Sequence, residues 1–276
     1  MASRPASHVA LTFAAVIACA SPAFATWSVV AVDQGSGTMV VASAACVAQA
    51  AFATFPASGL MDIQAIVVPG RGVAVAQAAV DATRANQELI AAELGKGTAP
   101  SAIVELLKQD PNLESRQFGI ADVQGRTAAF SGSMNGAFAI SRQDRVPGTG
   151  IYFSVQGNQL ADTDVVIAAV SAIMGSSGTL ADRVMLAMEA GDAKGGDRRC
   201  TCATAPRPSA PCETKTAHVA YLLRAEAADR PGNGINTGVY AMYLSVTNQD
   251  IMPSENANPI KTLRTRYDAW KKAHPR

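Results

Sequence analysis

Thr26 has the most distinctive chemical setting in this sequence, because it directly follows a segment with the features of a secretion signal. Arg4 precedes an apolar stretch over residues 9–20, and Ala23-Phe24-Ala25 places small residues where signal peptidase requires them. Cleavage after Ala25 would make Thr26 the first residue of the mature chain. Its hydroxyl would then lie beside its own α-amino group, whose pKa is about 7.7–8 in unperturbed peptides. One residue would supply both the nucleophile and the base.

The apolar stretch of the leader is about a dozen residues long, which is shorter than the ~20 residues needed to cross a bilayer. The sequence therefore predicts that residues 1–25 are a signal peptide and are removed, and not that they anchor the chain. The mature protein is predicted to be periplasmic or secreted, with no membrane association after processing.

Histidine-dependent catalysis has little support in this sequence. A serine triad needs an imidazole to shuttle the proton, and only His218 and His274 lie beyond the predicted signal peptide. His274 is next to the C-terminus, and His218 falls in a predicted strand. Paired carboxylates for glycoside chemistry remain open, but turn capping explains each candidate more simply. These candidates lie at the ends of predicted elements: Asp33, Asp81, Asp122 and Asp197.

The cysteines predict disulfide bonds. Cys46, Cys200, Cys202 and Cys212 remain after processing, an even number in an oxidising compartment. Direct pairing of Cys200 with Cys202 would be strained, so the expected bonds join Cys46 to one of that pair, or one of that pair to Cys212. A zinc site could instead use the last three cysteines with His218, but the spacing is irregular. We therefore predict no metal and no cofactor.

The charge balance argues against nucleic acid as a partner. The chain has 23 Lys and Arg and 22 Asp and Glu, so loss of Arg4 leaves 22 charges of each sign. There is no run of basic residues to bind nucleic acid or an anionic membrane. The 251 residues that remain of 276 can form one sizeable core. The sequence leaves homo-oligomerisation open.

The order of the expected elements favours two packed sheets. The mature chain opens with a β-hairpin, Thr26–Asp33 and Thr38–Ser43, around a Gly-rich turn. The further expected strands are Ile66–Val68, Gly72–Gln77, Arg116–Asp122, Arg126–Ser131, Ile151–Gln156 and Lys215–Arg224. The expected helices are Asp81–Leu94, residues 98–109, residues 163–174 and residues 179–189. This order predicts a sandwich of two sheets between two helical layers, and not a doubly wound parallel sheet.

We expect one domain over residues 26–225 and a C-terminal extension over residues 226–276. The extension ends in a helix that begins at Asn258-Pro259, where asparagine caps the helix and proline takes its first position. Its apolar stripe should dock on the domain: Ile260, Leu263, Tyr267 and Trp270.

Several blocks of the chain resemble a bacterial family known as domain of unknown function 1028 (DUF1028). The first block, Thr26-Trp27-Ser28-Val29-Val30-Ala31-x-Asp33, is similar to the "T-[FWY]-S-I-V-A-x-D" start of that family. The other blocks follow in the same order and with matching spacing over residues 26–224. They are Val41-Ala42-Ser43, Gly72-Val73-Ala74-Val75-Ala76-Gln77, Arg116-Gln117-Phe118-Gly119-Ile120-x-Asp122 with Gly125-Arg126, Val155-Gln156-Gly157-Asn158-x-Leu160, and Ala193-x-Gly195-Gly196-Asp197-Arg198-Arg199.

This resemblance implies a fold and a nucleophile. The family is grouped with the N-terminal nucleophile (Ntn) hydrolases, so the expected fold is α+β, a four-layer αββα sandwich, here with a C-terminal helical extension. The implied nucleophile is Thr26. The sequence departs from the family where Cys200-Thr201-Cys202 and a Pro-rich loop follow the Gly-Gly-Asp block, and where the chain continues past Arg224.

The matching blocks also suggest residues that would surround Thr26. Ser43 and Gln77 could orient the amine or donate a hydrogen bond to an oxyanion, and Asn158 is a suitable amide donor for an oxyanion hole. Asp33 and Asp197 could hold the α-ammonium group or a cationic substrate. Each of these residues also has a structural explanation, such as capping a turn or satisfying buried backbone.

Two functions follow from these observations. The first is an exported hydrolase that uses Thr26 to cleave an amide or peptide-like bond in a small molecule or peptide. The alternative is a non-catalytic envelope protein that uses the same fold to bind a ligand. A third interpretation makes the Cys- and Pro-rich loop, residues 200–213, and the C-terminal helix a docking surface for a partner.

Overall fold

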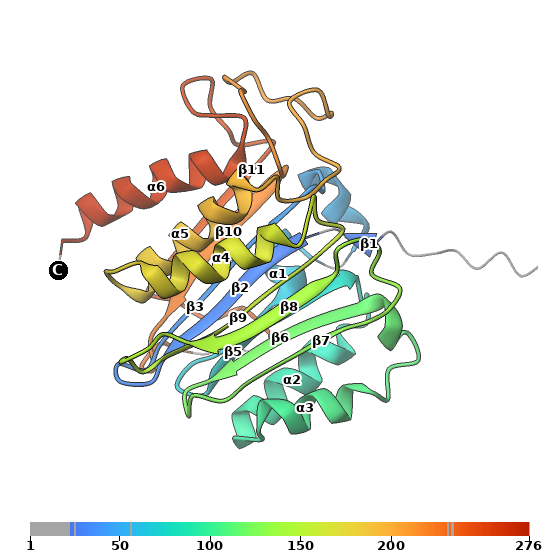
Figure 1. Cartoon of the computed structure of the whole chain (residues 1–276), viewed down its shortest axis with the longest axis vertical. Helices are drawn as coiled ribbons and strands as arrows, with labels where there is room; N and C mark the ends of the chain where they lie inside the picture. Colours follow the sequence, from blue (N-terminus) through green and yellow to red (C-terminus); the bar gives the residue numbers. More distant parts are fainter. Residues whose placement is uncertain (1–22, 25, 56, 231, 233–234, 276) are drawn as a thin grey trace, which may run out of the picture.

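The computed structural model describes residues 23–24, 26–55, 57–230, 232 and 235–275. They form a mixed α+β fold with two antiparallel sheets (Figure 1). Most of the predicted signal peptide, including Ala25 at the expected cleavage site, lies outside the described residues.

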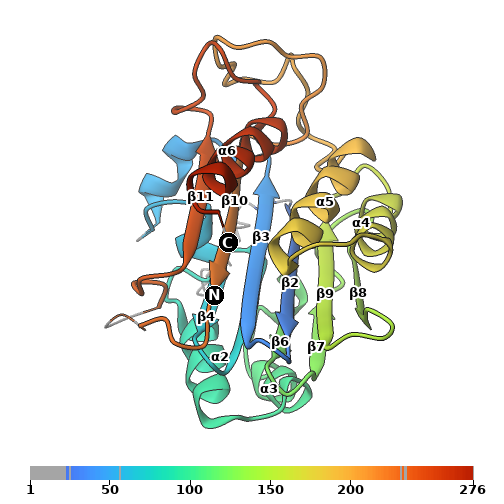
Figure 2. The same ribbon diagram turned by 90° about the vertical axis from the view of Figure 1, so that its left-hand side faces the viewer.

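The larger sheet is built around the N-terminal hairpin. In the described part of the chain it has six strands in the order β11-β10-β3-β2-β9-β8 (Figure 2). The hairpin strands are the central pair, and the turn between them contains Gly37 with φ of 72°, a conformation that favours glycine. The strand bounds are β2 Thr26–Asp33, β3 Thr38–Ala45, β8 Ile140–Arg145, β9 Ile151–Asn158, β10 Val219–Ala225 and β11 Met242–Thr247.

The second sheet has five described strands. Its main path is β1-β5-β6-β7, and β4 pairs with β5 as well. The strand bounds are β1 Ala23–Phe24, β4 Ala65–Val68, β5 Gly72–Ala79, β6 Arg116–Asp122 and β7 Thr127–Ser131. Strand β1 therefore belongs to this sheet, whereas β2, which begins two residues after β1 ends, belongs to the other.

Helices pack on the outer face of each sheet (Figure 1). One apolar cluster joins the six-stranded sheet to α4, α5 and α6, and another joins the five-stranded sheet to α2 and α3. The short helix α1 leads into β4, and two 3₁₀ turns cover residues 49–54 and 113–115. The helix bounds are α1 Leu60–Gln64, α2 Ala85–Lys96, α3 Pro100–Leu107, α4 Asp164–Gly175, α5 Leu180–Ala193 and α6 Pro259–Ala273.

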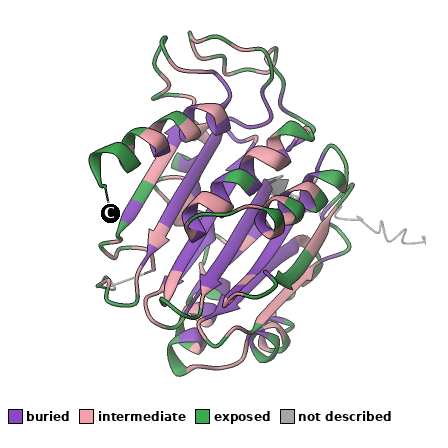
Figure 3. Cartoon of the chain, turned by 60° about the vertical axis from the view of Figure 1, so that its left-hand side comes forward, coloured by how far each residue is buried: buried purple, intermediate pink, exposed green. Residues whose placement is uncertain are grey.

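A third apolar cluster lies between the two sheets. Because side chains alternate along a strand, Trp27 and Val29 of β2 face the helices, whereas Val30 and Val32 face the other sheet. The four inner strands of the six-stranded sheet, β10, β3, β2 and β9, are buried along most of their length (Figure 3). The residues that precede Val30 on the same face are Thr26 and Ser28, and both are fully buried. Polar groups therefore replace the apolar core at one end of the space between the sheets.

Most of the predicted elements are confirmed, with shifted ends. Helix α2 begins at Ala85, later than predicted, because Asp81 instead forms a turn by accepting hydrogen bonds from the backbone of Thr83 and Asn86. Strand β10 begins at Val219 and not at Lys215. Four of the helices and strands were not predicted: α1, β1, β8 and β11.

The C-terminal extension is an integral part of the fold. Strand β11 pairs with β10 over six residues on each strand, from Val219 opposite Thr247 to Arg224 opposite Met242. Helix α6 buries Ile260, Leu263 and Tyr267, as its stripe predicts, and Trp270 packs against the same cluster. Polar contacts reinforce it, because Tyr267 donates a hydrogen bond to Asp182 of α5 at 2.9 Å.

Among the described residues, none of the helices combines the length and the apolar character that spanning a bilayer requires.

Candidate functional site

Thr26 is the first residue of β2, and its side chain is fully buried. In the sheet it lies opposite Ala45 of β3 on one side and Asn158 of β9 on the other. The side-chain amide of Gln64, the last residue of α1, approaches it from another direction, with Nε2 at 3.4 Å from Thr26 Oγ1. Two carboxamide side chains therefore border the threonine.

Both carboxamides have an unpaired oxygen. Asn158 Nδ2 donates to Gln117 Oε1 at 3.0 Å, but Asn158 Oδ1 is buried and has no hydrogen-bond partner. Gln64 Oε1 is likewise buried and unpaired. An unsatisfied buried acceptor costs about 1–3 kcal/mol. Two such acceptors beside one residue form a place where a donor group would be stabilised.

A chain of hydrogen bonds links the two sheets next to Thr26. Ser28, two residues along β2, donates to Gln77 Oε1 of β5 at 2.6 Å. Gln77 Nε2 donates to Gln117 Oε1 of β6 at 2.7 Å, the same oxygen that accepts from Asn158. Gln117 in turn donates to the backbone oxygen of Gly157 at 2.8 Å. These contacts hold Gln117 in place, and Gln117 in turn fixes the orientation of the Asn158 side chain.

Gln156 extends the same network along β9. Its Nε2 donates to Ser28 Oγ at 2.7 Å, and its Oε1 accepts from Ser154 Oγ at 2.7 Å. The glutamine side chain fits only because residue 119 is glycine, since a Cβ there would lie 2.0 Å from Gln156 Oε1. A residue with no side chain on β6 therefore makes room for a polar group from β9.

The predicted site residues are only partly brought together. Asn158 borders Thr26. Gln77 accepts a hydrogen bond from Ser28 and is linked to Asn158 through Gln117. Ser43 is fully buried and donates to the backbone oxygen of Trp27 at 3.0 Å, so its hydroxyl is used within the sheet.

Asp33 lies at the far end of β2 from Thr26. There its carboxylate accepts hydrogen bonds from the backbone of Gly35 and from the hydroxyl of Ser36. Asp33 therefore shapes the hairpin turn and is not near Thr26.

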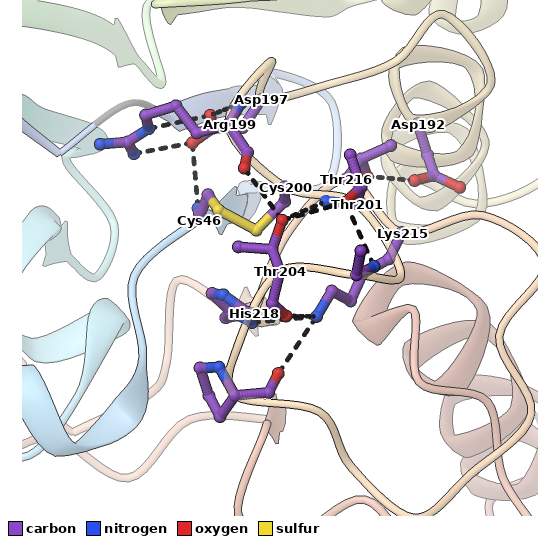
Figure 4. The surroundings of a disulfide bond; sticks show 12 residues. Cys46, Asp192, Asp197, Arg199, Cys200, Thr201, Thr204, Lys215, Thr216 and His218 are labelled. Atoms are coloured by element: carbon purple, nitrogen blue, oxygen red, sulfur yellow. Dashed lines mark hydrogen bonds and ion pairs between the residues drawn. A yellow bond between two sulfur atoms is a disulfide. The ribbon is translucent and has the colours of Figure 1, made fainter.

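Asp197 lies at the same end of the sheet as Thr26, because its carboxylate accepts from the backbone of Cys46, the residue after β3, at 3.0 Å. It also forms an ion pair with Arg199 at 2.8 Å (Figure 4). Burial raises the pKa of Asp197, although Arg199 and the backbone donors oppose this effect. The carboxylate thus ties the end of β3 to the loop that follows α5.

Two disulfide bonds are present, Cys46–Cys200 and Cys202–Cys212. They include both kinds of pairing that the sequence suggested. The structure does not form the cysteine zinc site, because all four thiols are used in these bonds. The sulfurs of the first bond and a ring nitrogen of His218 lie within 4.8 Å of one another, but a disulfide offers no thiolate to a metal.

Lys215 and His218 lie beside the first disulfide (Figure 4). Lys215 Nζ donates to the backbone oxygens of Thr204 and Pro206 at 2.8 and 3.1 Å, and it lies 3.5 Å from His218 Nδ1. Burial and the Lys215 ammonium lower the pKa of His218 to about 4, so the imidazole is neutral at pH 7. The Lys215 side chain therefore holds the Cys- and Pro-rich loop by binding the backbone oxygens of that loop.

Three glutamines of the site were not identified from the sequence. Gln64 contacts Thr26, whereas Gln117 and Gln156 belong to the hydrogen-bond network that contains Ser28 and Asn158. A signal for one of them is visible, since Ser154, Gln156 and Asn158 alternate with apolar residues and so share one face of their strand. For Gln64 the signal was absent, because the helix that carries it was not predicted.

The model of the family described as "Family of unknown function (DUF1028)" matches residues 26–231, and this match begins at Thr26. A similar solved structure is the crystal structure of protein SPO2555 from Silicibacter pomeroyi, which is assigned to the same family model. The two chains share 23% sequence identity, with a TM-score of 0.61, over 90% of this chain and 89% of the other. No curated protein matches the chain. Since the family model covers most of the sequence, the protein belongs to the DUF1028 family of unknown function.

Proposed function

We propose that this protein is an exported hydrolase of the Ntn type, with Thr26 as its nucleophile. In this proposal signal peptidase removes residues 1–25, and the α-amine of Thr26 is the base that activates its hydroxyl. The two sheets and their covering helices then correspond to the four-layer αββα sandwich of that superfamily. The substrate is an amide or a peptide-like bond.

The observation that carries this proposal is the pair of unpaired carboxamide oxygens beside Thr26. Cleavage after residue 25 would create an α-ammonium group with three hydrogen-bond donors. Asn158 Oδ1 and Gln64 Oε1 are buried acceptors without partners at this position. A new amine would meet acceptors that the uncleaved chain leaves unused, so the site suits a terminal threonine better than an internal one.

The surrounding amides also suit the later steps of the reaction. Gln64 Nε2 already lies 3.4 Å from Thr26 Oγ1, so it is placed to donate to an oxyanion that forms next to this oxygen. Gln117 accepts from Asn158 and thereby holds its carboxamide in one orientation. A site in which donors are fixed in advance needs little reorganisation as charge develops.

Two observations support export. Disulfide bonds form and persist in oxidising compartments, and this chain has two of them. The segment before Thr26 has the charge, apolar length and small residues of a cleavable signal. A periplasmic or secreted location agrees with both features.

N-terminal sequencing and intact mass of the protein purified from the exporting cell test the first step. We expect Thr26 at the N-terminus with a free amine. A library of amide and peptide substrates then tests the second step, with Thr26→Ala as the inactive variant and Thr26→Ser, which keeps the hydroxyl, as its matched control. A chain that starts elsewhere, or turnover that survives in Thr26→Ala, would contradict the proposal.

A second candidate is a non-catalytic ligand-binding protein of the cell envelope. The observation that favours it is the complete burial of the Thr26 side chain. In this case the mature protein would bind a ligand without turning it over, and Thr26→Ala would leave ligand binding unchanged.

A further inference from the structure

The residues immediately before Thr26 already form a strand. Ala23 pairs with Ala79, and Phe24 pairs with Ala78, both in antiparallel orientation on β5. Thr26 pairs with strands of the other sheet. Phe24 and Thr26 therefore pair in different sheets, and the expected cleavage lies between these two paired residues.

The pairing of β1 covers an edge that no other described strand occupies. On this side of β5, strand β4 pairs only with residues 72–75. On the opposite side, β6 pairs with β5 as far as Ala78. Loss of β1 would therefore leave the backbone of Ala78 and Ala79 without a strand on one side. Exposed backbone groups at a sheet edge are a ready template for another extended chain.

The end of β5 is held in place by contacts that do not involve β1. Arg116 Nη1 donates to the backbone oxygen of Ala79 at 2.8 Å, and Arg116 Nε pairs with Asp110 at 2.8 Å. Each of these two side chains is only 9% exposed. Ala78 has φ of 73°, an unusual conformation for a residue with a Cβ. Strained backbone of this kind is found where surrounding structure enforces it, often at ligand sites.

We propose that the mature protein binds its substrate as an extended peptide in the place of β1, paired with Ala78 and Ala79. The inference rests on the proposed function, in which residues 1–25 are removed and Thr26 is the nucleophile. It adds the substrate class: peptides with at least three residues on the acyl side of the scissile bond, of which the first two pair with β5. Single-residue amides lack the atoms that would pair with β5.

The position of β1 explains why such a peptide would react. In the uncleaved chain, the residue after Phe24 is bonded through its carbonyl carbon to the nitrogen of Thr26. A peptide in the same register brings its third carbonyl carbon next to Thr26. The Thr26 oxygen bonds to this carbon while its proton passes to the α-amine. The amide C–N bond then breaks, and the departing amine takes up this proton. Water hydrolyses the resulting ester and restores the free threonine.

The leader itself supplies the first probe. We would compare three aminomethylcoumarin amides on the mature protein: acetyl-Ala-Phe-Ala, acetyl-Ala, and an acetyl-Ala-Phe-Ala with N-methyl groups on its first two residues. The methyl groups remove the backbone donors and keep the side chains. We expect the unmodified tripeptide to have a kcat/KM at least about tenfold above each of the others. Acetyl-Ala lacks the two residues that pair with β5, and the methyl groups remove a strand donor and keep the two backbones apart.

Direct binding separates this inference from the catalytic proposal. Fluorescein-labelled Ala-Phe-Ala amide should bind the mature Thr26→Ala variant, with hydrogen-exchange protection at residues 78–79, whereas its N-methylated form should bind at least about tenfold more weakly. Binding with these properties but no turnover by the native protein would support the peptide site and overturn the proposed function. Equal binding of the two forms, or no binding of either, would overturn the peptide site even if small amides are hydrolysed.

Discussion

Thr26 and Asn158 lie directly opposite each other on neighbouring strands, and both side chains are fully buried. Directly opposed residues in an antiparallel pair have their Cβ atoms about 4.5–5.5 Å apart. The carboxamide of Asn158 is therefore close enough to influence any charge that forms on Thr26. Its unpaired Oδ1 makes that influence testable through the pH dependence of catalysis.

Asn158→Asp and Asn158→Ala should shift the pH profile in opposite directions. In the proposed mechanism the α-amine of Thr26 must be neutral to act as the base, so its pKa would set the acidic limb of kcat/KM. A carboxylate at position 158 stabilises the ammonium form and should move this limb about one unit to higher pH. Alanine removes the acceptor and should move the limb to lower pH. Profiles measured with one substrate check this prediction, and an unchanged limb in both variants would contradict it.

Gly119→Ala should destabilise the protein by about 1–3 kcal/mol, as expected for overpacking. The new Cβ would lie 2.0 Å from Gln156 Oε1 and 2.4 Å from its Cδ, so the glutamine would have to leave its hydrogen bonds. Gly95→Ala is the matched control, because a Cβ at this helical position meets nothing within 4 Å. It should be neutral or stabilising by up to about 1 kcal/mol. Urea unfolding of both variants measures the difference. Equal unfolding midpoints for the two variants would show that the Gln156 side chain can move away from residue 119 at no cost in stability.

His218 should make the protein less stable in mild acid. Its pKa is about 4 in the folded protein, compared with about 6.5 in the unfolded chain. The unfolded chain therefore binds the proton first, so stability is complete above pH 6.5 and decreases as the pH falls toward 4. His218→Gln should remove up to about 2 kcal/mol of this decrease. Denaturant unfolding between pH 7 and 4 tests this prediction, and a His218→Gln variant that keeps the native slope would contradict it.

Asp182 should hold α6 against α5. Hydrogen bonds from Thr179 and Lys271 overcome the effect of burial and lower its pKa to about 2. Its contribution to stability is present above pH 3.8 and is lost as the pH falls toward 2. At pH 7, Asp182→Asn should cost about 1–2 kcal/mol. Asp268→Asn, which removes an exposed partner of the same lysine, should cost less than about 0.5 kcal/mol. Thermal unfolding at pH 7 compares the two variants, and similar costs would contradict a special role for Asp182.

The parts of the fold that could be predicted are those with a local signal. The hairpin of β2 and β3 alternates and has a glycine turn, and Thr179 caps α5 with both hydrogen bonds of a capping box. By contrast, β8 is an edge strand whose residues are half-buried or exposed and include Arg142 and Arg145. Its position depends on pairing with β9, and such pairing leaves no periodic apolar pattern in the sequence.

The candidate site was harder to predict than the fold. Thr26 and Asn158 could be named because of the predicted cleavage and the family resemblance. Gln117 and Gln156 were not named, because a glutamine in a strand can face solvent or a neighbouring sheet, and the packing of the sheets decides between them. For Gln156 the alternation along β9 gives only the weaker signal that it shares a face with Asn158. Asp33 was placed near Thr26 by its block, but the two residues are at opposite ends of one extended strand.

The Cys46–Cys200 bond joins residues 154 positions apart and so closes most of the chain into a covalent ring. This ring includes α1 to α5 and every described strand of the five-stranded sheet except β1. A protease that cuts one loop within residues 47–199 would open the ring without releasing a fragment. The parts of a nicked molecule would stay covalently joined until the disulfide is reduced, so a single cut by a protease need not dismantle the protein.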